Sequence, residues 1–299
     1  MIATRDFSWI WQGKEIVLGL DEVGEGPLVV LLPALSSIST RREMRPLMER
    51  LAPDFRVVAL DWPGFGTLPR PPITWTPDAM SVFLQHALQT IVTRLSKTDG
   101  AARIALRLVA AGHAATYALH QAAHHPGSVA RIALIAPTWR GPLPTMAGGE
   151  RPLFARIRRA VEAPIIGPLL YRLNVNPFVV RKMVAGHVYS EPNALSAART
   201  AEKHEVVAAP GARFASAAFV TGGLDRVSSR DDFLALAARA ALPLMLVYGA
   251  ETPPRSRAEM EALAALPGVR SERLPRGKLS VHEEFPDDVY AAIKPFLAQ

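Results

Sequence analysis

The sequence predicts an α/β fold in which a mostly parallel central sheet carries helices on both faces. Short runs rich in Val, Ile and Leu, such as 27–33 and 129–139, are typical of strands that are buried on both sides. Stretches with apolar residues at helical spacing separate these runs. Neighbouring parallel strands need crossover connections, so this alternation favours a sheet covered by helices. A chain of 299 residues is long enough to bury such a core.

The elements before the third parallel strand follow this rhythm. Residues 6–24 predict two antiparallel strands, and Pro27 and Pro33 bound the first parallel strand. The remaining predictions here are a helix over 39–52 capped by Ser39 or Thr40, a strand and Pro/Gly turn over 55–66, and a helix over 76–95 capped by Thr76.

From 140 to 210 the pattern changes. No β-branched apolar run occurs there, and prolines interrupt a series of short helical patterns. This predicts a first core segment over 1–139, an inserted helical cap over 140–210 and a second core segment over 211–299. Within the core, we expect strands at 103–111, 129–139, 242–249 and 269–275, and helices at 113–125, 228–241 (capped by Ser228 or Ser229), 255–266 and 286–299.

Composition excludes several classes of function. The net charge of +7 comes from arginines spread along the chain, so we expect no nucleic-acid binding. Zero cysteines exclude disulfides and thiolate metal sites, and the histidines lack a metal-ligand pattern, so no metal or cofactor is expected. The N-terminus lacks a signal-peptide pattern and no apolar run is long enough to span a bilayer, which predicts a cytoplasmic protein.

The stretch "RLVAAGHAATYAL" (107–119) is typical of a buried strand, a tight turn and the start of a helix. It follows "DWPGFG" at the end of the second parallel strand and precedes the helical insertion and two closing strands. In this order the chain resembles the α/β-hydrolase superfamily of the cap-domain type. The resemblance places Gly112 where the nucleophile of the G-x-S-x-G elbow stands.

The resemblance also implies positions for the other two members of the catalytic triad. The acid is expected in the frame set by Gly249, where this chain has Thr252, and a shift of one position to Glu251 would restore a carboxylate. The histidine position holds Leu279, with His282 three residues later. The triad is therefore degenerate, because an ester hydrolase of this type needs a nucleophile, a base and an orienting acid.

The main functional prediction is a protein that binds a small hydrophobic or acyl-like molecule in a lidded pocket, with little or no ordinary esterase activity. We expect Leu35, Ser36, Gly112 and His113 at this pocket. A glycine at position 112 would relieve the strain of a positive φ. The sequence leaves two interpretations of His113. Its imidazole lies near the pocket, or it is a neutral ring that is hydrogen-bonded in the first helical turn.

Two other functions stay open. A hydrolase or lyase of another class would use His113 or His282 as acid/base catalyst. His282 would otherwise be a surface residue paired with Glu283 or Glu284. A hydrolase with a relocated triad would recruit Asp225, which we otherwise expect in a turn or bonded to Arg226 or Arg230. Asp61 is expected to hold its own turn through an Asx-type hydrogen bond.

The predicted cap contains a basic amphipathic helix near 151–161. Its apolar residues at helical spacing favour packing over the pocket, and its basic face would attract an anionic substrate, a membrane surface or a partner, or simply lie in solvent. The residues concerned are Arg151, Arg156, Arg158, Arg159, Leu153, Phe154, Ile157 and Val161.

Overall fold

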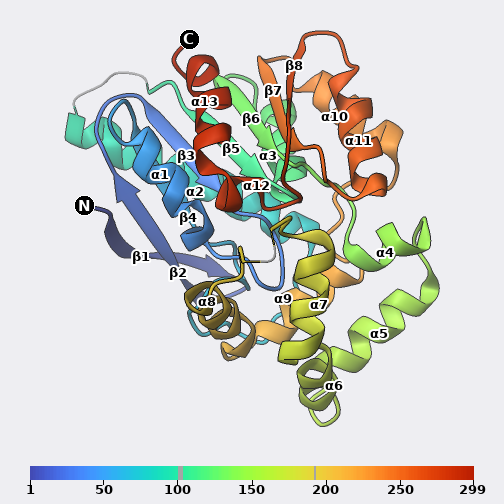
Figure 1. Ribbon diagram of the computed structural model, residues 1–299. Coiled ribbons are helices and arrows are strands. Elements are labelled where there is room, and N and C mark those ends of the chain that lie inside the picture. Colours follow the sequence, from blue (N-terminus) through green and yellow to red (C-terminus); the bar gives the residue numbers. More distant parts are fainter. Residues whose placement is uncertain (100–103, 192) are drawn as a thin grey trace.

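The computed structural model describes residues 1–99, 104–191 and 193–299. An eight-stranded sheet with the order β1-β2-β4-β3-β5-β6-β7-β8 forms the centre of the molecule (Figure 1). The β1–β2 and β2–β4 pairs are antiparallel, and every other neighbouring pair is parallel. This confirms the predicted α/β fold.

The parallel strands are short, and the inner ones are buried because helices cover both faces. The strands are β1 (Ala3–Trp11), β2 (Lys14–Val23), β3 (Leu28–Leu32), β4 (Arg56–Leu60), β5 (Arg107–Ala111), β6 (Arg131–Ile135), β7 (Leu244–Gly249) and β8 (Val269–Leu274). The strand predicted over 103–111 begins at Arg107, and residue 103 lies outside the described part of the chain.

Helices α1 and α13 cover one face of the sheet, and α2, α3, α10 and α11 cover the other (Figure 1). Together with the short helices η1 and α12, they make up the helices of the core. Their bounds are η1 (Arg41–Met44), α1 (Arg45–Leu51), α2 (Pro77–Asp99), α3 (Ala114–His124), α10 (Arg230–Arg239), α11 (Pro254–Ala264), α12 (Val281–Glu284) and α13 (Pro286–Leu297).

The capping predictions have different outcomes. Thr76 and Ser229 accept hydrogen bonds from Ala79 and Asp232 N–H, which confirms both as caps. Thr40 precedes η1 but caps nothing, because its hydroxyl donates to the carboxylate of Asp61 instead.

Six helices project from the carboxyl end of β6 to form one end of the molecule (Figure 1). They are α4 (Pro142–Ala147), α5 (Pro152–Glu162), α6 (Gly167–Asn174), α7 (Pro177–His187), α8 (Ala197–Ala208) and α9 (Ala212–Val220). The prolines seen in the sequence begin four of these helices, where a missing N–H costs nothing. The boundaries at 139 and 210 stay a prediction.

Helix α5 does not turn its whole apolar stripe inward, contrary to the prediction. Phe154 is buried, but Leu153 and Ile157 are exposed to solvent. The helix packs along α9 and α6, which cover only part of its circumference.

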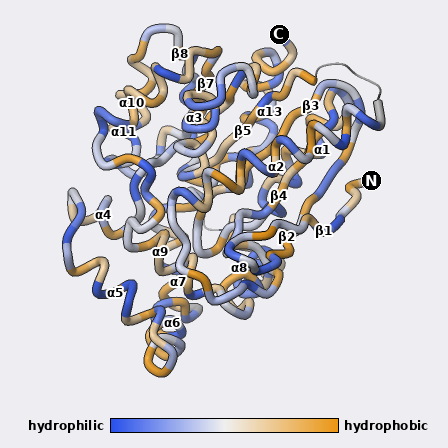
Figure 2. The backbone as a smooth tube through the Cα atoms, turned by 180° about the vertical axis from the view of Figure 1, so that it is seen from behind, coloured by the Kyte–Doolittle hydropathy of each residue, from blue (hydrophilic) through white to orange (hydrophobic). Residues whose placement is uncertain are grey.

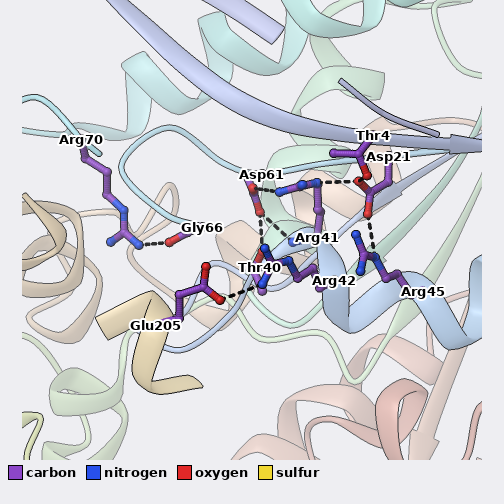
Figure 3. A network of polar contacts seen from close by, with 10 residues as sticks. All are labelled: Thr4, Asp21, Thr40, Arg41, Arg42, Arg45, Asp61, Gly66, Arg70 and Glu205. Atoms are coloured by element: carbon purple, nitrogen blue, oxygen red, sulfur yellow. Dashed lines mark hydrogen bonds and ion pairs between the residues drawn. The ribbon is translucent and has the colours of Figure 1, made fainter. Parts of the chain in front are cut away.

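A buried ionic network ties the first strands to the loops above them (Figure 3). Arg41 donates from Nε to Asp21 of β2 at 2.9 Å and from Nη1 to Asp61 after β4 at 2.6 Å. Asp61 also accepts from the N–H of Arg41 and the hydroxyl of Thr40. Asp61 therefore holds the segment that follows β3, and its expected Asx-type role in its own turn is wrong.

Candidate functional site

The turn after β5 has the backbone of a nucleophile elbow but no side chain at its apex. Gly112 has a φ of +52°, a conformation that strains any residue with a Cβ. Its N–H donates to the carbonyl of Ile135 at 2.9 Å, and α3 begins two residues later. A Cβ at this position would lie 3.1 Å from the Cβ of Ala34. The turn thus fits glycine in both conformation and space.

The other two expected triad positions also carry no ionisable group. The hydroxyl of Thr252 is buried and has no hydrogen-bond partner in the described part of the chain. The neighbouring Glu251 accepts from the N–H of Gly277 at 3.1 Å, so its carboxylate stabilises a turn after β8. Leu279 donates its N–H to the carbonyl of His187 at 3.4 Å and so contacts the end of α7.

His113 is a buried, neutral histidine directly after the elbow. Its Nε2 lies 3.1 Å from the carbonyl oxygen of Leu224. A carbonyl only accepts, so Nε2 carries the proton and Nδ1 is bare; Nδ1 has no partner among the described residues. Burial lowers the pKa of His113 to about 4. The predicted neutral ring therefore results from burial, and its partner lies outside its own helical turn.

Asp225 faces His113, and its predicted arginine partners are wrong. Its Oδ1 lies 3.5 Å from Nε2 of His113 and accepts from the N–H of Gly141 at 2.8 Å. Arg226 pairs instead with Asp78, and Arg230 with Glu259. Burial raises the pKa of Asp225 to about 8, so the carboxyl is largely protonated at neutral pH.

This pair predicts a specific dependence of stability on pH. Between pH 3.8 and about 8 the folded Asp225 holds a proton that the unfolded chain has lost, so stability falls as pH rises. Between about 4 and 6.5 the unfolded His113 holds the extra proton, so stability rises with pH and the two slopes oppose each other. We expect Asp225→Asn to remove a slope of about 1.4 kcal/mol per pH unit above pH 6.5.

Urea unfolding of both proteins at closely spaced pH values between 5 and about 8 measures this slope. In Asp225→Asn, stability should rise up to about pH 6.5 and then stay level. Equal slopes in the two proteins above pH 6.5 would contradict the assignment of a protonated Asp225.

His282 is buried, so its interpretation as a surface residue is wrong. Its Nε2 lies 3.4 Å from Oε1 of Glu43, which also accepts from the N–H of Ala34 at 2.9 Å. Burial alone would raise the pKa of Glu43, but His282 and Lys203 outweigh burial and lower it.

The acidic neighbours of His282 bind the cap instead of the imidazole. Glu283 accepts from the hydroxyl of Tyr189 at 2.6 Å and from Lys203 at 3.1 Å, and Glu284 accepts from Ser190. The helix that contains His282 is therefore a contact between core and cap. A role for His282 as acid/base catalyst stays a prediction.

The loop after β3 lies beside the elbow and contacts α9. Leu35 is fully buried, and the hydroxyl of Ser36 accepts weakly from the N–H of Ile38 at 3.5 Å. The hydroxyl of Ser37 lies 2.6 Å from that of Ser216 in α9. Leu35 and Ser36 follow β3, beside the elbow that follows β5, but their expected role in ligand binding stays a prediction.

A larger cavity of about 720 Å³ lies between cap helices α6, α8 and α9 and the loop at 70–72. Its walls are mostly apolar, and its lining includes basic residues but no acidic one. The lining consists of Arg70, Pro72, Pro168, Tyr171, Arg172, Val175, Asn176, His204, Val207, Ala208, Ala209, Gly211, Ala212, Arg213 and Phe214.

Arg70 is the polar group with the most unusual surroundings in this cavity. The residue is only 7% exposed and donates to the carbonyls of Gly66 (Figure 3) and Val206. Its Nε has no partner, and no carboxylate lies within ion-pair distance of it in the part of the chain that the structure describes. Burial lowers the pKa of Arg70 to about 10, which still leaves it charged at neutral pH.

A smaller cavity of about 250 Å³ lies beyond β6, lined by Trp139, Arg140, Arg255 and Glu259 among others. The Glu259 carboxylate there is already paired with Arg230. Gly112, His113 and His282 line neither cavity. Across residues 1–99, 104–191 and 193–299, no group of three His, Asp or Glu side chains is arranged to hold a metal ion, and no helix is long and apolar enough to cross a membrane.

Sequence reasoning missed Asp225 and Glu43 as histidine partners and Arg70 as a cavity residue. Each lies far along the chain from the group it faces, and none belongs to a short motif. Only Asp225 had a local signal in the sequence. The Gly222–Gly223 pair before it indicates a turn, and such a turn can place a side chain at the end of a helix.

The parallel sheet, the positive-φ turn after β5 and the helices inserted after β6 together define an α/β-hydrolase fold. The model of the alpha/beta hydrolase family matches residues 29–293, so the chain belongs to this family. No curated protein matches the sequence.

Solved structures agree with this assignment of the fold. Epoxide hydrolase CorEH superposes with a TM-score of 0.70 at 17% identity, over 98% of this chain and 100% of that one. A thermophilic esterase from Thermogutta terrifontis gives 0.70 at 21% identity, over 99% and 98%. A haloalkane dehalogenase variant from Bradyrhizobium elkanii gives 0.69 at 17% identity, over 99% and 97%. At these identities the likeness concerns the fold alone.

Proposed function

We propose that this α/β-hydrolase family member binds a small amphipathic acyl-like molecule in the cap cavity and lacks ordinary esterase chemistry. The single observation that carries the proposal is Arg70, a buried arginine that lines an apolar cavity of about 720 Å³ and has no carboxylate partner among the described residues. This volume lies within the usual range for small-molecule sites.

The electrostatics of the cavity favour an anionic end on the ligand. A buried charge is costly unless it is paired, and the carbonyls that Arg70 contacts carry only partial charges. Arg172 and Arg213 add to the positive potential. A carboxylate matches a guanidinium well, while the apolar walls suit a hydrocarbon body. A short fatty acid has this combination of groups.

The surroundings of the elbow argue against nucleophilic catalysis. Gly112 has no side-chain oxygen that could act as a nucleophile. The hydroxyl of Ser37, in the loop after β3, is hydrogen-bonded to Ser216 and not to a base. Serine is a weak nucleophile without a base in hydrogen-bond contact. The alternative of acid/base chemistry by His113 or His282 has less support, since neither histidine lines a described cavity.

Isothermal titration with decanoate and with decanol tests the proposal. We expect decanoate to bind at least about 10-fold more tightly than decanol, because charge-assisted hydrogen bonds contribute about 1.5–3 kcal/mol. Arg70→Met should reduce this preference and leave decanol binding unchanged. No fluorophosphonate labelling and no hydrolysis of p-nitrophenyl decanoate are expected.

Two further variants make the test specific to the cavity. Arg181→Met removes an exposed cation of α7 that does not line the cavity, and it should leave both affinities unchanged. Val175→Trp narrows the cavity and should weaken both ligands. The proposal fails if neither ligand binds, if Val175→Trp has no effect, or if a serine is labelled and the ester is hydrolysed.

A further inference from the structure

The far end of the cap exposes an unusual concentration of apolar side chains. Of fifteen large hydrophobic residues exposed in the described chain, ten lie between residues 153 and 183. We call them the cap-tip surface: Leu153, Ile157, Ile165, Ile166, Leu169, Leu170, Leu173, Phe178, Val179 and Met183. Ile165 is 90% exposed and Phe178 is 74% exposed. Such a concentration is rare on a protein that meets only water.

The cap-tip surface lies on α5, α6, α7 and the segments between them. These helices protrude furthest from the sheet (Figure 1). Figure 2 shows hydrophobic colouring at the tip of the cap, beside α6. This surface is therefore free to contact a broad, flat partner without hindrance from the core.

The same segment is strongly basic. Residues 141–190 contain two acidic residues, Glu150 and Glu162, against seven basic ones. The basic residues are Arg151, Arg156, Arg158, Arg159, Arg172, Arg181 and Lys182. In the part of the chain that the structure describes, none of the seven lies within ion-pair distance of a carboxylate. Their positive charge is thus available to a partner.

We propose that the cap-tip surface docks on a membrane that contains anionic phospholipids. Apolar side chains enter the boundary between headgroups and acyl chains, and arginines beside them bind the lipid phosphates. A second copy of the chain fits less well, because it would bring another seven unpaired cations against the first seven. Helix α6 contributes to both this surface and the cap cavity, so an amphipathic ligand dissolved in the membrane would be close to its site.

Co-sedimentation with sucrose-loaded vesicles tests the proposal on the full-length protein. We expect binding to phosphatidylcholine vesicles that contain about one third phosphatidylglycerol, and at least about 10-fold weaker binding to phosphatidylcholine alone. High salt should weaken the binding because it screens exposed charges. Removing the apolar side chains (Ile165→Ser, Leu169→Ser, Phe178→Ser) or the charges (Arg156→Gln, Arg159→Gln, Arg181→Gln) should each weaken it about 10-fold or more.

Matched controls lie on strands of the core sheet, outside the cap-tip surface. Ile10→Ser removes an equally exposed apolar side chain from β1, and Arg273→Gln removes an exposed cation from β8. Both should bind vesicles as the unmodified protein does. The proposal is overturned if the cap variants behave like these controls, if phosphatidylglycerol makes no difference, or if size-exclusion chromatography shows a dimer that the Ile165→Ser, Leu169→Ser, Phe178→Ser variant dissociates.

Discussion

Arg41→Met is expected to lower the free energy of unfolding by about 3–5 kcal/mol, because it leaves the buried Asp61 without its arginine and takes one of two arginines from the buried Asp21. Asp21 and Asp61 are 0% and 2% exposed, and Arg41 contacts both. Arg41, Arg45 and Thr4 together lower the pKa of Asp21 although burial alone would raise it. Urea denaturation at neutral pH measures the loss.

A surface ion pair between β1 and β2 serves as the control. Arg5→Gln breaks the contact with Glu22 at 2.8 Å, but Arg5 is 45% exposed, so we expect a loss below about 1 kcal/mol. Adding Asp61→Asn to Arg41→Met should recover part of the lost stability, since one unpaired charge is removed. A loss of similar size for Arg5→Gln and Arg41→Met would contradict the idea that burial decides the cost.

Local patterns were sufficient to predict the class and order of the core elements. Apolar runs such as that of β3 and capping residues such as Thr76 and Ser229 act within a few positions of the chain, so the sequence displays them directly. Thr40 shows where this approach ends. Its hydroxyl was expected to bond the helix backbone but donates to the carboxylate of Asp61, and only the folded chain brings that carboxylate close.

The candidate site was predictable only where it depends on backbone conformation. The small residues around Gly112 indicated a strained turn, and the φ of +52° confirms it. The partners of the histidines were hidden because Asp225 and Glu43 belong to distant segments that meet in the folded protein. The orientation of α5 was hidden for a related reason, since an amphipathic pattern does not say how much of the helix surface its neighbours cover.

Gly112→Ser is expected to destabilise the protein by about 1–3 kcal/mol without creating an esterase. The serine would have to adopt a strained positive φ, and its Cβ would lie 3.1 Å from the Cβ of Ala34. Gly112→Ala should cost about the same, because the cost arises from the Cβ and the hydroxyl adds little. Thermal unfolding and the hydrolysis of p-nitrophenyl acetate measure the two effects.

We expect no esterase activity from Gly112→Ser because of where the imidazoles are held. The ring of His113 is oriented by the carbonyl of Leu224 and that of His282 faces Glu43, while Thr252 and Leu279 supply neither the acid nor the base that a serine at position 112 needs. Combining Gly112→Ser with Thr252→Asp and Leu279→His supplies the missing acid and base, and this variant should hydrolyse the ester faster than the single variant does. Hydrolysis by Gly112→Ser alone would instead mean that a resident histidine already acts as the base at the elbow.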